Sequence, residues 1–281
     1  MKLVSFSNNG QESFGILGNS GLHPVLKNFK KDFPDLKAVF GSQKSESLEA
    51  FCEENPIPLS KVSLLPPIPN PDKIICAGMN YRKPYPVDGV APPDPGNVVI
   101  FARHTETLVG HGADLELPSG KASETYDFEG EIVAVIGKSG RFISKDDALK
   151  HIIGYSIMNE GSVRGWMKHS VHAGKNFHAS GSWGPWITTV DEIDDFSSLK
   201  LETYVNGKLM QSASAGEMIF SLSELISYIS NLLPVNPGDI ISTGAPDGTG
   251  GSRNPTAFLN SGDRVEVSVD RIGTLKNYVK P

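Results

Sequence analysis

The sequence is poor in cysteine, has no cluster of basic residues and lacks a long apolar run. Only two of its 281 residues are cysteines, Cys52 and Cys76, too few for a disulfide framework or a cysteine-ligated zinc site. The 26 basic residues are outnumbered by 32 acidic ones, which argues against nucleic acid or an anionic membrane as a partner. No apolar stretch approaches the roughly 18 residues of a membrane span, and the N-terminus shows no secretory signal. We therefore predict a reduced, cytosolic protein that crosses no membrane.

The prolines are concentrated in two segments that divide the chain. Four of them fall within residues 66–71, and a segment of this kind is extended and stiff, as linkers are. The sequence therefore predicts a small N-terminal α+β domain over residues 1–65, a linker over 66–71 and a larger domain over 72–281. Five further prolines fall in the 19-residue loop 79–97, and a loop of this length is typically a lid, a binding loop or disordered.

Strand patterns predominate over helix patterns, and no repeated alternation of strand and helix is present. The predicted strands are 3–6, 13–18, 72–78, 98–102, 152–159, 184–190, 240–243, 264–270 and 274–279, with helices near 24–31, 45–54, 145–151 and 221–233. The dipeptide Asn206-Gly207 predicts the turn of a hairpin over 200–211. These elements predict a mostly antiparallel β-roll or β-sandwich of the α+β class.

The strongest chemical signal is the stretch DFEGEIVAVIG, residues 127–137. Its second half is an apolar run typical of a buried strand, whereas its first half places Asp127, Glu129 and Glu131 two residues apart. In a strand such side chains project from one face, about 7 Å apart. Acids that lead into a core strand need neutralisation, which a hard divalent cation would supply. The alternative is an edge strand whose outer face is solvated.

Other patterns fit known sites less well. The glycine-rich loop 243–252 lacks the signature of a phosphate-binding loop and opens no predicted helix, so sharp turning or close backbone approach explains its glycines better. His169, His172 and His178 form an array without a cysteine or a predicted helix to align them, and a polar loop that borders a site is the preferred interpretation. No serine has the spacing of a nucleophile elbow.

Taken together, three segments resemble the fumarylacetoacetate hydrolase family: DFEGEIVAVIGKSGRFISKDDAL, GYSIMNEGSVRGW and PGDIISTGAPDGTG. Shorter matches are AGMNYR at 77–82, GPWIT at 184–188, TYVNGKLMQ at 203–211 and the closing GDRVEV and IGTLKN. The likeness runs from about residue 71 to 279. It implies a β-roll catalytic domain, usually homodimeric, that binds one Mg2+ (or Mn2+ or Ca2+) per subunit and acts on a 2-oxo or β-dicarbonyl acid.

The resemblance also assigns residues to roles. Glu129 and Glu131 match the metal-binding E-x-E pair, and Glu160 falls where the family more often has aspartate, so we expect metal binding with altered geometry. The implied catalytic residues are Lys175, Tyr81 and Arg164. The implied substrate-binding residues are Thr243, Gly244 and Arg82.

The chain departs from the family at the pair that activates water. The positions of the family's histidine and glutamate hold Pro84 and Val87, neither of which can move a proton. Hydrolysis depends on such a base, whereas decarboxylation and tautomerisation need no water nucleophile. We predict a metal-dependent enzyme that forms an enolate, with C–C bond cleavage by hydrolysis or decarboxylation as the first hypothesis. A tautomerase, a specialised biosynthetic enzyme and an inactive paralogue that binds a 2-oxo acid are the alternatives.

Overall fold

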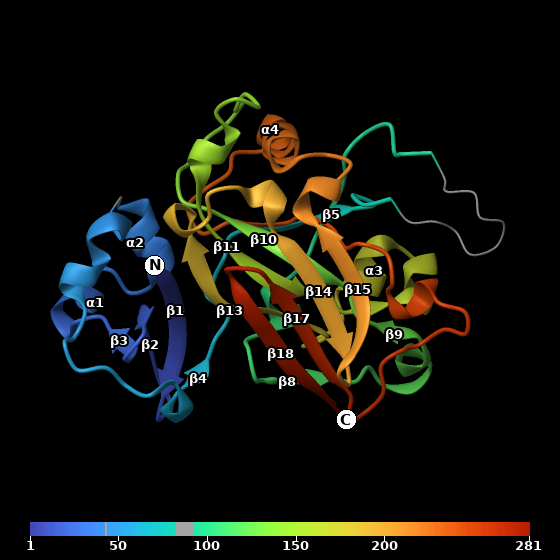
Figure 1. Cartoon of the computed structure of the whole chain (residues 1–281), viewed down its shortest axis with the longest axis horizontal. Helices are drawn as coiled ribbons and strands as arrows, with labels where there is room; N and C mark the ends of the chain where they lie inside the picture. Colours follow the sequence, from blue (N-terminus) through green and yellow to red (C-terminus); the bar gives the residue numbers. More distant parts are fainter. Residues whose placement is uncertain (43, 83–92) are drawn as a thin grey trace.

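The computed structural model describes residues 1–42, 44–82 and 93–281, and two packed sheets dominate it (Figure 1). The larger sheet has eleven strands in the described part of the chain. Its main path runs β3 (Gly21–Pro24), β2 (Gln11–Gly18), β1 (Lys2–Asn8), β13 (Gly181–Thr189), β11 (Ile152–Asn159), β10 (Gly130–Ile136), β16 (Ile240–Ser242), β5 (Ile74–Gly78) and β6 (Val99–Ala102). Two short strands join it from the side: β4 (Ser63–Leu64) pairs with β1, and β7 (Leu108–Val109) pairs with β13.

A five-stranded sheet packs in front of the larger one in Figure 1. Its order is β15 (Lys208–Ser214), β14 (Lys200–Val205), β17 (Arg264–Val269), β18 (Gly273–Lys280) and β8 (Asp114–Glu116). The predicted hairpin is confirmed, because Asn206 and Gly207 adopt φ values of 53° and 80° between β14 and β15. Two positive φ angles in a row are the geometry of a type I′ turn, which suits Asn-Gly.

The main core lies between the two sheets. It combines alternate residues of β10 (Ile132, Ala134, Ile136) with Leu201, Val267 and Val269 of the smaller sheet, and helix α4 (Leu222–Leu232) closes its upper end. The predicted helix near 221–233 is confirmed, and its buried residues Leu222, Leu225, Ile226 and Ile229 form one apolar face. Strand β17 alternates between buried and partly buried residues, whereas all seven residues of β10 are buried because the larger sheet is covered on both faces.

The N-terminal residues cover the other face of the larger sheet. Helices α1 (Lys27–Asp32) and α2 (Leu36–Gly41) lie beside β1 at the left of Figure 1. Phe29 and Phe40 share one core cluster with Val133 of β10 and Trp183 of β13. Strand β1 also pairs with β13, so the N-terminal residues and the larger domain share a continuous sheet. The division into domains at 65 and 71 stays a prediction.

Several helical segments differ from those the sequence predicted. Helix α2 was missed, although Asp35 caps it by accepting a hydrogen bond from the Ala38 amide. The stretches predicted as helices at 45–54 and 145–151 contain only 3-10 turns, Ser45–Phe51 and Ala148–His151. The irregular stretch before β13 holds a short helix, α3 (Val171–Lys175), where no helix was expected. Among the described residues, no helix has the length and apolarity that a membrane crossing requires.

Candidate metal centre and active site

The acidic stretch is divided between two strands rather than forming one. Asp127 ends β9 (Tyr126–Asp127), which pairs with β12 (Ser162–Val163), and β10 begins at Gly130. Both Glu129 and Glu131 are buried, with 4% and 1% of their surface exposed. Strand β10 lies between β11 and β16 in the interior of the sheet, so the alternative of a solvated edge strand is wrong. Neutralising partners for these carboxylates must therefore come from inside the protein.

The third glutamate reaches the pair through the register of two neighbouring strands. Gly130 lies opposite Asn159, the last residue of β11, and the amide of Glu160 then donates to the Glu129 carbonyl oxygen at 2.7 Å. Carboxylate oxygens of Glu129, Glu131 and Glu160 lie within 4.8 Å of one another. The structure thus brings together the three residues that the resemblance assigned to a metal.

Lys175 lies at the centre of this cluster. It ends α3, whose N-cap Ser170 accepts a hydrogen bond from the Ala173 amide. Its Nζ donates to Glu129 Oε2 and to Glu160 Oε2, and the side chain is 5% exposed. Burial opposes the charged ammonium, but the two carboxylates outweigh it and raise the pKa of Lys175. Lys175 is therefore a protonated hydrogen-bond donor between two glutamates.

Glu131 is held by the strand and loop on its other side. Its Oε2 accepts from Ser242 Oγ at 2.6 Å and from the Gly244 amide at 2.9 Å. Burial, and then the charges of Glu160 and Glu129, raise the pKa of Glu131. The hydroxyl and the amide fix one oxygen, so the carboxylate has a defined orientation in the cluster.

Arg164 joins two acids of the same stretch. Its Nε donates to Asp127 Oδ2 at 2.7 Å, and its Nη2 lies 2.9 Å from Glu129 Oε1. Burial disfavours the charged guanidinium, but Glu129 and Asp127 more than offset this and raise the pKa of Arg164. Its side chain as a whole stays 23% exposed, although the Nη2 atom is buried.

The residues present fit a divalent cation. With Glu131 ionised, as a metal ligand must be, four carboxylates (Asp127, Glu129, Glu131 and Glu160) face three cations (Arg103, Arg164 and Lys175), which leaves one net negative charge in a buried region. Glu160 Oε1 is buried without a hydrogen-bond partner among the described residues, and Arg103 Nη1 is 4.0 Å from it. The Cys76 thiol is a neighbour whose pKa is raised by burial and then by Glu160. Carboxylate oxygens are the donors that Mg2+ and Mn2+ prefer.

The other predicted site residues lie at different depths. Tyr81 is buried, and burial followed by the charge of Glu131 raises the pKa of its hydroxyl. Thr243 is fully buried, with Oγ1 donating to the Ile132 carbonyl at 2.9 Å. The guanidinium of Arg82 is exposed and pairs with Asp94 at 2.7 Å. The substituted pair at Pro84 and Val87 lies outside the described residues. The roles of Tyr81, Thr243, Arg82 and Gly244 stay predictions.

The histidine array does not form a metal site in the described part of the chain. His169, His172 and His178 belong to no group of three or more candidate ligands there. His178 instead pairs with Glu116 on the surface, with Nδ1 2.8 Å from Oε2. His172 does lie on a helix, α3, where the sequence predicted none.

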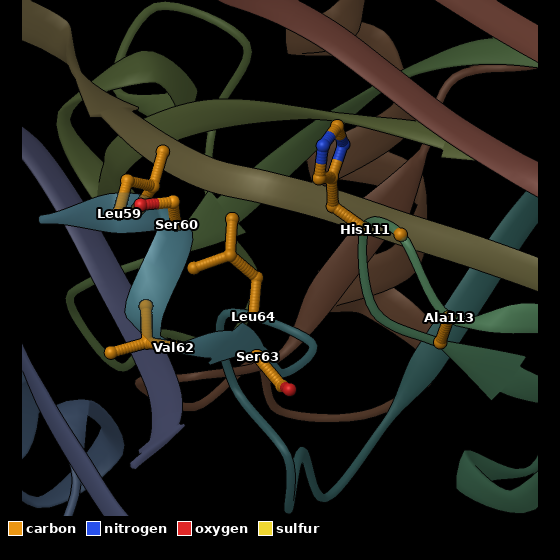
Figure 2. Close-up of a pocket in the computed structure, with 8 residues that line it drawn as sticks. Leu59, Ser60, Val62, Ser63, Leu64, His111 and Ala113 are labelled. Atoms are coloured by element: carbon orange, nitrogen blue, oxygen red, sulfur yellow. The ribbon is translucent and has the colours of Figure 1, made fainter.

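A surface pocket of about 450 Å³ lies elsewhere on the molecule (Figure 2). It is lined on one side by Leu59, Ser60 and residues 62–64 and on the other by residues 111–113. None of the predicted site residues lines this pocket. It has no carboxylate or cation in its lining, and the carboxylate cluster is therefore the better candidate for chemistry.

Comparison with known proteins tests the family that the sequence motifs indicated. The family model described as fumarylacetoacetate (FAA) hydrolase C-terminal matches residues 73–280. The chain belongs to the fumarylacetoacetate hydrolase family. This confirms the family that the motifs indicated and its mostly β fold.

Two named relatives of this family member are oxaloacetate tautomerases. The oxaloacetate tautomerase YisK of Bacillus subtilis is 41% identical over 224 residues, 79% of this chain and 74% of that protein. A mitochondrial oxaloacetate tautomerase of Bos taurus is 34% identical over 271 residues, 93% of this chain and 85% of that protein. Among solved structures, a fumarylacetoacetate hydrolase from psychrophilic Exiguobacterium antarcticum superposes with a TM-score of 0.84 at 29% identity, covering 100% of this chain and 99% of that one.

The sequence did not indicate the residues whose hydrogen bonds hold the backbone and side chains of the carboxylate cluster in place. Arg103 is buried, with Nη1 donating to the Gly161 carbonyl at 2.9 Å, and Ser162 Oγ donates to Glu129 Oε2 at 2.8 Å. Gln211 accepts from the Gly130 amide at 2.9 Å and donates to the Pro246 carbonyl at 2.8 Å. Nothing in their local sequence marks these residues, because each acts through a contact distant in the chain.

Proposed function

We propose that this family member interconverts the keto and enol forms of oxaloacetate or a closely similar 2-oxo acid, with a divalent cation on Glu129, Glu131 and Glu160. The observation that carries the proposal is the buried cluster of these glutamates with Lys175 between two of them. The substrate class is supported by the names of the relatives, which are oxaloacetate tautomerases at 41% and 34% identity.

This proposal reverses the order of the two reactions considered from the sequence. C–C cleavage came first there, and tautomerisation was an alternative. Both reactions pass through the same enolate, but tautomerisation requires only that a proton move between oxygen and carbon. The names of the relatives favour tautomerisation, and Pro84 and Val87 are compatible with it because, unlike hydrolysis, it does not require an activated water.

A divalent cation bound to the three glutamates would supply a Lewis acid for the 2-oxo group and its neighbouring carboxylate. The proton transfer itself falls to Lys175. As an ammonium, its Nζ can give a proton to C3 of the enol and accept the proton of the enol hydroxyl, so the amine ends in its starting state. Its carboxylate partners keep it charged between turnovers, since they raise its pKa.

Neighbouring groups would bind and orient the substrate. The hydroxyl proton of Thr243 is used in the hydrogen bond from Oγ1 to the Ile132 carbonyl. Thr243 can therefore accept a hydrogen bond from the substrate but cannot donate one to its carboxylate. Negative charge on a dicarboxylate is better matched by the charged Arg164, whose side chain is 23% exposed. Tyr81 keeps its hydroxyl proton because its pKa is raised, so it can donate a hydrogen bond to an oxygen of the substrate.

The first test is Glu131→Ala. We expect this variant to lose Mn2+ binding in a calorimetric titration and to lose tautomerase activity, because it removes one of three ligands and leaves Ser242 Oγ and the Gly244 amide without their acceptor. Activity is followed through the ultraviolet absorbance of the oxaloacetate enol, and released pyruvate is measured in parallel to detect C–C cleavage.

Glu54→Ala is the matched control, because Glu54 is exposed. It should keep both metal binding and activity. Full activity in Glu131→Ala would rule out the metal-dependent mechanism. Pyruvate formation faster than tautomerisation in the unaltered protein would favour the C–C cleavage hypothesis, and metal binding without either reaction would favour an inactive 2-oxo-acid-binding protein.

Two further expectations from the sequence remain proposals. The family resemblance suggests a homodimer, which sedimentation or light scattering can test. A cytosolic location fits the composition, and Cys52 and Cys76 are both free thiols, but the bovine relative carries a mitochondrial designation.

A further inference from the structure

The side chain of Asp127 is fully buried next to the cluster, yet it is not one of the three grouped glutamates. It accepts four hydrogen bonds: from the amides of Phe128 (2.9 Å), Gly250 (2.7 Å) and Gly251 (2.9 Å) and from Arg164 Nε (2.7 Å). Both carboxylate oxygens are thereby used by the protein itself. Asp127 is thus placed to organise its surroundings rather than to bind a ligand.

Two of the four glycines in the loop 243–252, Gly250 and Gly251, lie against this carboxylate. A Cβ atom at Gly250 would lie 2.6 Å from Asp127 Oδ1, and one at Gly251 would lie 3.2 Å from Oδ2 and 3.4 Å from Arg164 Cγ. Side chains at these positions would push the loop away from Asp127. The two glycines therefore allow two backbone amides to approach a buried carboxylate of the protein itself. In a phosphate-binding loop, the amides would instead approach a bound ligand.

Residues 127–131 also hold the other end of the loop 243–252. The Gly244 amide donates to Glu131, and Gln211 links the Gly130 amide to the Pro246 carbonyl. Loop 243–252 is thus held against residues 127–131 at three places. A displacement of Asp127 would reach the loop, Arg164 and, through Arg164, Glu129.

We propose that Asp127 is a positioning residue that aligns Arg164 with Glu129 and anchors loop 243–252, and that it does not bind the metal. A guanidinium is planar, so fixing Nε on Asp127 and Nη2 on Glu129 also fixes Nη1. Among the described residues, Nη1 donates only to Met167 Sδ, a weak acceptor 3.8 Å away, so Nη1 is available to a substrate carboxylate. This inference rests on the proposed function in naming the metal site and a carboxylate ligand, but not in naming the reaction.

The test compares two affinities in Asp127→Asn, measured by calorimetry: Mn2+ for the protein, and oxalate for the Mn2+-loaded protein. We expect Mn2+ affinity to stay within about threefold of the unaltered protein, because no ligand is removed. Oxalate affinity should fall about tenfold, since a neutral amide holds Arg164 less firmly than a carboxylate does. When Arg164 is already replaced by glutamine (Arg164→Gln), adding Asp127→Asn should lower the affinity for oxalate by less than a further twofold. The reason is that Asp127 affects oxalate binding through Arg164.

Asp194→Asn is the control, because Asp194 is 88% exposed and pairs only with Arg271 at the surface among the described residues. If Asp127→Asn does not fold, Gly251→Ala replaces it: the added methyl displaces Asp127 and Arg164 without removing a charge, and oxalate affinity should again fall while Mn2+ affinity holds. Loss of Mn2+ binding in the folded variant, unchanged oxalate affinity, or independent effects of Asp127 and Arg164 would each overturn the proposal. Both affinities can be measured whether or not the protein turns over oxaloacetate, so failure of the proposed function is a separate result.

Discussion

At the scale of single residues, the site depends on how buried charges compensate one another. Lys175 and Arg164 each contact two acids, and Arg103 stands behind Glu160. Removing one partner of a buried pair leaves the other without compensation, which typically costs about 3–5 kcal/mol. The cluster is therefore sensitive to single substitutions, and the readout must separate loss of function from loss of the fold.

The variant Lys175→Met distinguishes loss of catalysis from loss of the fold. Methionine keeps most of the side-chain length but carries no proton, so we expect the tautomerase rate to fall by about 10²–10⁴-fold, as for loss of a general acid. Mn2+ binding should persist, because the three glutamates remain and the cation compensates them. The measurement is kcat for oxaloacetate with saturating Mn2+.

Lys208→Met is the matched control for Lys175→Met, since Lys208 is exposed in the hairpin between β14 and β15. Its kcat should equal that of the unaltered protein. A Lys175→Met variant within threefold of that value would show that another group moves the proton.

At the scale of elements, helix α4 shows how local chemistry fixes a boundary. Ser221 accepts from the Glu224 amide, and Glu224 accepts in return from the Ser221 amide at 2.9 Å, which forms a capping box. Lys145 donates to Glu224 at 2.7 Å from outside the helix. The hydrogen bond from Lys145, followed by those from Ser221, lowers the pKa of Glu224 to about 2.

This shift gives the capping box a pH dependence. The pKa of Glu224 is about 2 in the folded protein and about 4.3 when the chain is unfolded, so its stabilising effect is complete above about pH 4.3 and is lost as the pH falls toward 2. Glu224→Gln should therefore lower the urea midpoint at pH 6. The difference from the unaltered protein should shrink steadily below pH 4.

Glu54→Gln, an exposed substitution of the same chemistry, should leave the urea midpoint unchanged across this range. A Glu224→Gln difference that does not change between pH 6 and pH 3 would mean that the box contributes through geometry rather than through charge.

At the scale of the whole molecule, the N-terminal residues and the catalytic region share one sheet and one core. Leu3 pairs with Ile187 across β1 and β13, and both lie in the same buried cluster. A boundary between independently stable domains normally has few contacts across it. The shared cluster predicts instead a single cooperative unfolding transition.

Leu3→Ala tests this coupling. Leu3 is fully buried, so the substitution should cost about 2–5 kcal/mol and shift the entire transition, including that of the catalytic region. Circular dichroism and tryptophan fluorescence should give coincident midpoints. The exposed Leu209→Ala, at 46% exposure, should change the midpoint little. Two separate transitions, with only the first one shifted, would instead establish residues 1–65 as an independent domain.

The sequence alone determined the features that depend on neighbours in the chain. The hairpin at Asn206-Gly207, the capped helix α4 and the buried character of β10 follow from turn propensity, capping and apolar runs. The E-x-E pair and the family were readable for the same reason, because their motifs are contiguous. Helix α2 could also have been predicted from the capping residue Asp35 and the spacing of Leu36, Val39 and Phe40. It was missed because a helix of six residues gives only a short periodic pattern.

Only the tertiary structure decided which distant residues meet. Glu160 joins the pair because β11 and β10 align Asn159 with Gly130, and a one-residue slip would turn it away. Whether β10 lies inside the sheet or at its edge depends on pairing with β16, far along the chain. The contacts of Asp127 with Gly250 and Gly251 span more than a hundred residues. Local propensity specifies the elements, but long-range pairing, which no short segment encodes, places charge against charge and so makes the site.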